Sequence, residues 1–162
     1  MKQKVIKTTF YQTKYSLLTK EEKKLVDLAI NSLSLAYAPY SGFLVGSSIL
    51  LENGEIITGN NQENVAYPSG LCAERVAIYY AGAKFPKVKI KTIVITAKSK
   101  KFKMDDVVSP CGACRQSIAE YEVKQKQDIR ILLHHPDNSI VIINAISNLL
   151  PFMFKHEGLK NY

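Results

Sequence analysis

Three cysteines carry the most reactive side chains of this sequence. Cys111 and Cys114 follow directly after Pro110 with two residues between them, and Cys72 lies far upstream. Proline favours the first position of a helix, and residues three apart on a helical turn point the same way. Thiolate sulfur is a common ligand of Zn²⁺. The pattern predicts a metal site, although C-x-x-C also occurs in redox pairs and in structural zinc ribbons.

The number of available ligands bears on what the metal does. A structural zinc site has four protein ligands, and the chain has no fourth cysteine. A histidine could supply the fourth ligand, and the chain has three: His134, His135 and His156. They precede a Pro-Asp-Asn turn or lie in a polar tail, so we expect them at the surface instead. Three protein ligands and one open position are typical of a catalytic zinc that holds water.

A glutamate stands beside the first cysteine. Glu74 follows Cys72 by two residues, within the same predicted helical turn. Alone, it would be an ordinary acidic residue that complements the helix dipole. Together with P-C-x-x-C downstream, however, C-x-E is the signature of zinc nucleobase deaminases, in which the glutamate acts as general acid and base. The pattern therefore predicts Glu74 as the catalytic proton carrier.

The elements that must position these residues alternate along the chain. Thr19 and Glu22 fit a capping box, so a helix is expected from there to the stop at Pro39. Asn53-Gly54 predicts a hairpin between two short strands, and a second helix is expected from about Cys72. Further elements are expected as a strand at 90–97, a helix just after Pro110, strands at 129–134 and 139–143, and a short final helix at 145–150. This order predicts helices on both faces of a mixed sheet, with the starts of the two cysteine-bearing helices at one sheet edge.

Four sequence blocks resemble the cytidine deaminase family, specifically its homotetrameric class that acts on free nucleosides. They are YSGFLVG at 40–46, GNNQENVAYPSGLCAER at 59–75, SPCGACRQ at 109–116 and LLPFMF at 149–154. The resemblance implies an α/β fold, a three-layer α/β/α arrangement with a mixed five-stranded sheet. It also implies one zinc-binding domain over residues 1–162, with an N-terminal extension at 1–18 and a C-terminal tail at 155–162.

The resemblance also implies a role for each site residue. One Zn²⁺ per subunit would be held by Cys72, Cys111 and Cys114, with Glu74 as the proton shuttle. The implied substrate contacts are Phe43 against the pyrimidine, Asn61 and Glu63 at the ribose, Val65, Ala66 and Tyr67 in the pocket loop, and Phe154 from a neighbouring subunit. Val65 replaces a smaller residue of the family. Because three thiolates would give the zinc site a negative charge, Arg75 is expected to hydrogen-bond a cysteine sulfur, and Arg115 is the second candidate for such a contact.

The activity implied by the resemblance is hydrolysis of cytidine, and of deoxycytidine, to the uracil nucleoside and ammonia by a zinc-bound hydroxide, in pyrimidine salvage. Three alternative functions fit the sequence less well. Polynucleotide deaminases generally have histidine in place of Cys72, and blasticidin deaminases lack the N-Q-E-N-V-A-Y-P loop. A zinc-stabilised binding module would leave Glu74 without a role.

The composition bears on partners and location. The net charge is +8, but the lysines are scattered in short runs such as 20–24, 84–91 and 98–103, which are typical of solvated faces. We therefore expect no nucleic-acid partner. No apolar run is long enough for a membrane span, no secretory signal is recognisable, and a reducing compartment favours metal binding by the cysteines. The expectation is a cytoplasmic homotetramer with shared active sites.

Overall fold

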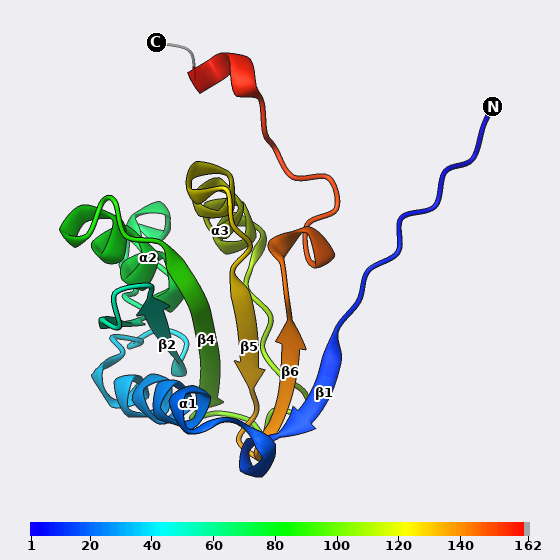
Figure 1. Ribbon diagram of the computed structural model, residues 1–162. Helices are drawn as coiled ribbons and strands as arrows, with labels where there is room; N and C mark the ends of the chain where they lie inside the picture. Colours follow the sequence, from blue (N-terminus) through cyan, green and yellow to red (C-terminus); the bar gives the residue numbers. More distant parts are fainter. Residues whose placement is uncertain (161–162) are drawn as a thin grey trace.

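A mixed sheet of six strands forms the centre of the structure, a computed structural model in which residues 1–160 are described (Figure 1). Its spatial order is β1-β6-β5-β4-β2-β3, and β4 and β5 are the parallel neighbours. The strands are β1 (Tyr11–Lys14), β2 (Phe43–Leu51), β3 (Ile56–Asn60), β4 (Ile90–Ser99), β5 (Arg130–His134) and β6 (Ser139–Ile143).

Three α-helices cover the sheet: α1 (Lys20–Ser32), α2 (Ala73–Lys84) and α3 (Gly112–Gln125). The predicted capping box starts α1, since the backbone N–H of Glu22 donates to Thr19 Oγ1 at 3.2 Å and that of Thr19 donates to Glu22 Oε2 at 3.0 Å. Short 3-10 helices are η1 (Tyr15–Leu17), η2 (Leu33–Leu35), η3 (Tyr67–Ser69), η4 (Ile146–Asn148) and η5 (Glu157–Lys160). None of the helices within residues 1–160 has the length and apolar character needed to cross a membrane.

Two apolar cores lie on opposite faces of the sheet. On one face, Leu25, Val26 and Ala29 of α1 pack with Val94 and Leu132 of the central strands. On the other face, α2 and α3 pack on the remaining side chains of the same strands; this larger core includes Ile78, Ile93, Ile95, Ile118, Ile131 and Leu133. The predicted three-layer α/β/α arrangement is confirmed.

The expected strand count was wrong by one. The sixth strand is β1, which belongs to the predicted N-terminal extension and pairs antiparallel with β6, from Tyr11 opposite Ile142 to Lys14 opposite Ser139. An unpaired outer edge of β6 would leave backbone N–H and C=O groups open to other chains, and β1 covers that edge. The expected final helix at 145–150 is also corrected, since only the 3-10 turn η4 forms there.

The sheet topology brings two helix starts together. Both β3 and β4 run antiparallel to β2, so they run in the same direction and their carboxyl ends lie at one edge. Each is followed by a helix, α2 after β3 and α3 after β4, and these helices therefore begin above that edge. The approach of β3 to α2 is close: a Cβ atom at Gly59 would lie 2.5 Å from the carbonyl oxygen of Ala73.

Candidate active site

The three cysteines converge where α2 and α3 begin. Cys72 is the N-cap of α2, Cys111 is the N-cap of α3, and Cys114 lies in the first turn of α3. The Cys111 sulfur is 3.8 Å from that of Cys72 and 3.4 Å from that of Cys114. All three sulfurs lie within 4.8 Å of one another. The prediction that residues so distant in sequence meet is confirmed.

This cluster fits a zinc ion. Four ligands at the usual Zn–S length of about 2.3 Å would place tetrahedral sulfurs about 3.8 Å apart, close to the observed separations. Helix N-termini add partial positive charge that favours thiolates. Within residues 1–160, the cysteines form the one group of three metal-binding side chains close enough to share an ion. The donor set of three sulfurs leaves a fourth position for a non-protein ligand.

Two histidines differ from the expected surface placement. His134 and His135 are buried, and their rings are held by local partners. Nδ1 of His134 lies 2.9 Å from Thr96 Oγ1, and Nε2 of His135 lies 3.2 Å from the carbonyl oxygen of Met104. The prediction failed because β5 lies between β6 and β4 inside the sheet. Its last residue, His134, and the following residue, His135, are therefore still buried. His156 is exposed, as expected.

The electrostatic surroundings of Cys72 favour its thiolate form. The Cys114 thiol and the Arg75 guanidinium outweigh burial and lower the pKa of Cys72 to about 5. Nη2 of Arg75 lies 4.0 Å from the Cys72 sulfur, which is where a hydrogen bond to a cysteine was expected. The Cys72 sulfur, together with burial, raises the pKa of Cys114.

Glu74 lies beside the cluster in the first turn of α2. Its side chain is buried, with 5% of the residue exposed, and burial raises the pKa of its carboxyl group. Its Oε2 atom has no hydrogen-bond partner among residues 1–160. A buried carboxyl with a free oxygen can accept and release a proton toward a small molecule in the adjoining space.

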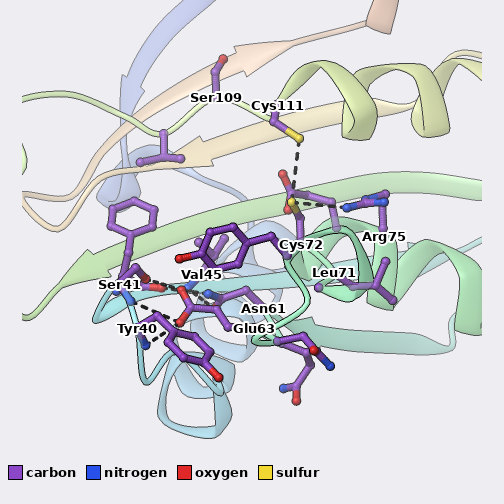
Figure 2. A pocket seen from close by; sticks show the side chains of 17 residues that line it. Tyr40, Ser41, Val45, Asn61, Glu63, Leu71, Cys72, Arg75, Ser109 and Cys111 are labelled. Carbon is purple, nitrogen blue, oxygen red and sulfur yellow. Dashed lines mark hydrogen bonds between the residues drawn. The ribbon is translucent and has the colours of Figure 1, made fainter.

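That space is a pocket of about 680 Å³. Figure 2 shows Cys72, Cys111 and Arg75 at one end, and Tyr40, Ser41 and Glu63 at the other. The volume is sufficient for a nucleoside-sized ligand. The predicted residues that line it are Phe43, Asn61, Glu63, Tyr67, Cys72, Glu74, Arg75 and Cys111.

Glu63 is held as a carboxylate at the far end of the pocket. It accepts hydrogen bonds from the backbone N–H of Tyr40 at 2.9 Å, from that of Ser41 at 3.2 Å, and from the Ser41 hydroxyl. The Ser41 hydroxyl is the largest cause of the lowered pKa of Glu63. Ser41 was not among the predicted site residues, although it belongs to the YSGFLVG block and carries the hydroxyl nearest to Phe43 in the chain.

Asn61 connects the pocket to the sheet. Its Oδ1 accepts from the backbone N–H of Val45 at 2.8 Å, and its Nδ2 donates to the carbonyl of Phe43 at 2.8 Å. The amide therefore fixes the start of β2, which carries Phe43. One lone pair and one N–H of the amide are not used by these two bonds.

Four predicted residues lie elsewhere in the single chain. Val65, Ala66 and Phe154 are exposed and do not line the pocket in the described part of the chain. Arg115 donates to the carbonyl oxygens of Pro110 and Leu149, each at 2.8 Å, so it ties α3 to the C-terminal segment instead of contacting a sulfur.

Fold and site together define a zinc-binding α/β enzyme domain with a buried glutamate in its pocket. The chain belongs to the cytidine and deoxycytidylate deaminase family, because the model of that family's zinc-binding region matches residues 19–127. This range contains the three cysteines and Glu74.

Individual relatives agree with this assignment. A probable cytidine deaminase of Dictyostelium discoideum is 37% identical over 139 residues, covering 86% of this chain and 87% of its own. The cytidine deaminase of Halalkalibacterium halodurans is 34% identical over 141 residues, which cover 87% of this chain and 99% of its own. The crystal structure of cytidine deaminase from Burkholderia pseudomallei superposes with a TM-score of 0.72 at 28% identity, covering 85% of this chain and all of that one.

Proposed function

We propose that this protein is a zinc-dependent cytidine deaminase that hydrolyses cytidine to uridine and ammonia, with deoxycytidine as a second substrate, in pyrimidine salvage. The observation that carries the proposal is the convergence of three cysteine sulfurs beside buried Glu74 at one end of a nucleoside-sized pocket. Its curated relatives of this length are named for the same activity.

Cys72, Cys111 and Cys114 would hold the ion. When bound, zinc lowers the pKa of a coordinated water, so that a strong nucleophile forms at neutral pH. Arg75 reduces the electron density that three thiolates place on the metal, through its contact with the Cys72 sulfur.

Glu74 is the proton carrier in this proposal. Its free oxygen takes a proton from the attacking water and delivers it to N3 of the cytosine as the C4–O bond forms. It then moves the proton of the new C4 hydroxyl group to the amino group, so that the C4 carbonyl forms as the C4–N bond breaks and ammonia leaves. Burial suits this role, because it raises the carboxyl pKa toward the range in which a group both accepts and donates a proton.

The opposite end of the pocket would bind the sugar. Glu63 is a carboxylate and accepts from the ribose hydroxyls, and Asn61 offers its remaining N–H and lone pair to the same diol. Phe43 would pack against the pyrimidine ring and Tyr67 would line the same pocket, whereas the exposed Val65 and Ala66 would contact the nucleoside in a neighbouring subunit's pocket.

We also propose that the enzyme is a homotetramer with shared sites. Phe154 is 72% exposed, and Gln116 holds its backbone at two points, donating to its carbonyl at 2.8 Å and accepting from its N–H at 3.0 Å. A large ring presented outward from an anchored backbone can fill a neighbour's pocket. The whole chain would act as one domain, and its unpaired thiols suit the cytoplasm.

The activity is tested by incubating the zinc-loaded protein with cytidine and following the ultraviolet change as uridine forms. Deoxycytidine, single-stranded DNA and blasticidin are run in parallel. Turnover of the free nucleosides alone supports the proposal. Turnover confined to the polynucleotide or to blasticidin would assign a different substrate class, and no turnover of any of them would favour a zinc-stabilised binding module.

Sharing of sites is tested by mixing two variants that are impaired in different ways, Phe154→Ala in nucleoside binding and Glu74→Gln in proton transfer. Phe154→Ala and Glu74→Gln subunits are purified separately, allowed to exchange, and assayed with cytidine. Hybrids contain some pockets with an intact Glu74 and a neighbour's intact Phe154, so activity should recover. No recovery despite demonstrated exchange of subunits would contradict the shared site.

A further inference from the structure

One aromatic side chain beside the pocket, Phe102, has no part in the proposed mechanism. Phe102 lies in the connection from β4 to α3, and 60% of the residue is exposed, which is unusual for a phenylalanine that only fills a core. Its ring stacks on that of Phe43, with 6.1 Å between centroids and 14° between planes. Phe43 lines the pocket, whereas Phe102 does not. Phe102 therefore contacts the pocket wall without forming it.

Two hydrogen bonds attach the same connection to the segment that precedes Phe43. The backbone N–H of Lys100 donates to the carbonyl of Gly42 at 3.0 Å, and Nζ of Lys101 donates to the carbonyl of Tyr40 at 2.9 Å. Gly42 has φ of 67°, a turn conformation that glycine adopts without strain. Residues 100–102 thus hold the turn that orients Phe43.

Phe43 is a half-buried side chain at the first residue of β2, so without a neighbour its ring would have freedom to change rotamer when no ligand is present. Fixing such a side chain on binding lowers affinity by a few-fold to about tenfold. Offset stacking between two rings removes much of that freedom in advance, and aromatic pairs of this kind are attractive beyond the area they bury. The observed geometry is a stacked pair within the usual range of centroid distances.

We propose that Phe102 is a positioning residue for substrate binding, which acts by fixing the ring of Phe43 against which the base packs. This inference rests on the proposed function, since it takes the base as the ligand of Phe43. Lys100 and Lys101 support the same arrangement by holding the turn at Gly42. Phe102 should affect the affinity for the substrate and not the chemical step, because it lies outside the pocket that Glu74, Cys72 and Cys111 line.

The first test compares Phe102→Ala with Phe102→Tyr and Phe10→Ala in the zinc-loaded protein. Phe10 has the same exposed fraction, 60%, and lies outside the pocket, so it is a matched control. In Phe102→Ala, the KM for cytidine and the Kd for uridine should rise about 2- to 10-fold, with kcat within about twofold. Phe102→Tyr keeps the ring and should restore both constants, and Phe10→Ala should leave them unchanged.

The second test is a double-mutant cycle with Phe43→Ala. If Phe102 acts through Phe43, adding Phe102→Ala to Phe43→Ala should change KM by less than about twofold, so the two effects are not additive. Full additivity, an unchanged KM in the single variant, or a loss of kcat or subunit association in place of affinity would each overturn the positioning role. The wild-type assay keeps the two proposals apart, because absence of cytidine turnover there refutes the proposed function itself.

Discussion

Substituting Gly59 by alanine should displace the first turn of α2 and, with it, the active-site residues that this turn carries. Gly59 lies on β3, and an added Cβ would stand 2.5 Å from the Ala73 carbonyl oxygen, 2.8 Å from the Ala77 nitrogen and 2.9 Å from the Ala77 Cβ. Ordinary contacts of a Cβ begin at about 3.4 Å. The first turn of α2 must therefore move away from β3 by a large fraction of an ångström, and that turn carries Glu74 and follows Cys72.

This crowding should lower the free energy of unfolding. Overpacking of a dense interior typically costs about 1–3 kcal/mol. For a chain of this size, each kcal/mol lowers the melting temperature by roughly 2–4 °C, so Gly59→Ala should melt about 2–12 °C lower. The effect on turnover should be larger than the loss of folded protein, because misplacing a catalytic group by about 1 Å can reduce the rate by about 100-fold.

Three measurements on Gly59→Ala check this reasoning: the melting temperature, the zinc content and the kcat for cytidine. Gly112→Ala is the control for stability, since a Cβ there meets no atom within 4 Å. It should melt no lower than the wild type. If Gly59→Ala keeps both the wild-type melting temperature and the wild-type kcat, the close approach of β3 to α2 does not position the site as argued.

Three further perturbations separate metal binding, buried polar contacts and sugar binding. Cys111→Ala should abolish zinc retention through dialysis and lower the melting temperature, because the ion joins two helix starts; a variant that stays zinc-free, active and equally stable would contradict the site. Glu122→Ala should cost about 2–6 kcal/mol of unfolding free energy, since Glu122 Oε1 accepts from the buried backbone N–H groups of Ile129 and Ile146, both at 2.9 Å. Glu122→Gln keeps an acceptor there and should cost much less in the same denaturant titration, and equal losses would refute the hydrogen-bond account. Ser41→Ala removes the bond that most lowers the pKa of Glu63, so the KM for cytidine should begin to rise at a higher pH during acidification, and an unshifted pH profile would count against Glu63 as the sugar ligand.

Local chemistry explains which elements could be predicted from the sequence. The capping box at Thr19 and Glu22 and the Asn53-Gly54 hairpin turn are short-range signals, and both form where expected. The cysteine cluster was also predictable, because two of its members share a helical turn and the alternation of strands and helices places the third at the same edge.

Features that depend on distant contacts were missed. Strand β1 pairs with β6 across almost the whole chain, and Tyr11–Lys14 has little burial of its own to reveal a strand. Burial of His134 follows from the position of β5 inside the sheet, which no local pattern encodes. The stacking of Phe102 on Phe43 joins a loop to a strand that is distant in the sequence, so no local sequence pattern could predict it.

The central claim is that Glu74 moves protons for hydrolysis in a pocket whose metal is held by cysteines alone. The most direct test measures zinc content and the kcat for cytidine in the wild type and in Glu74→Gln. The variant should retain one zinc per subunit and the wild-type melting temperature, because the three sulfurs are untouched, while kcat falls by at least about 10²- to 10⁴-fold. A variant that binds zinc and still turns over cytidine at nearly the wild-type rate would contradict the account.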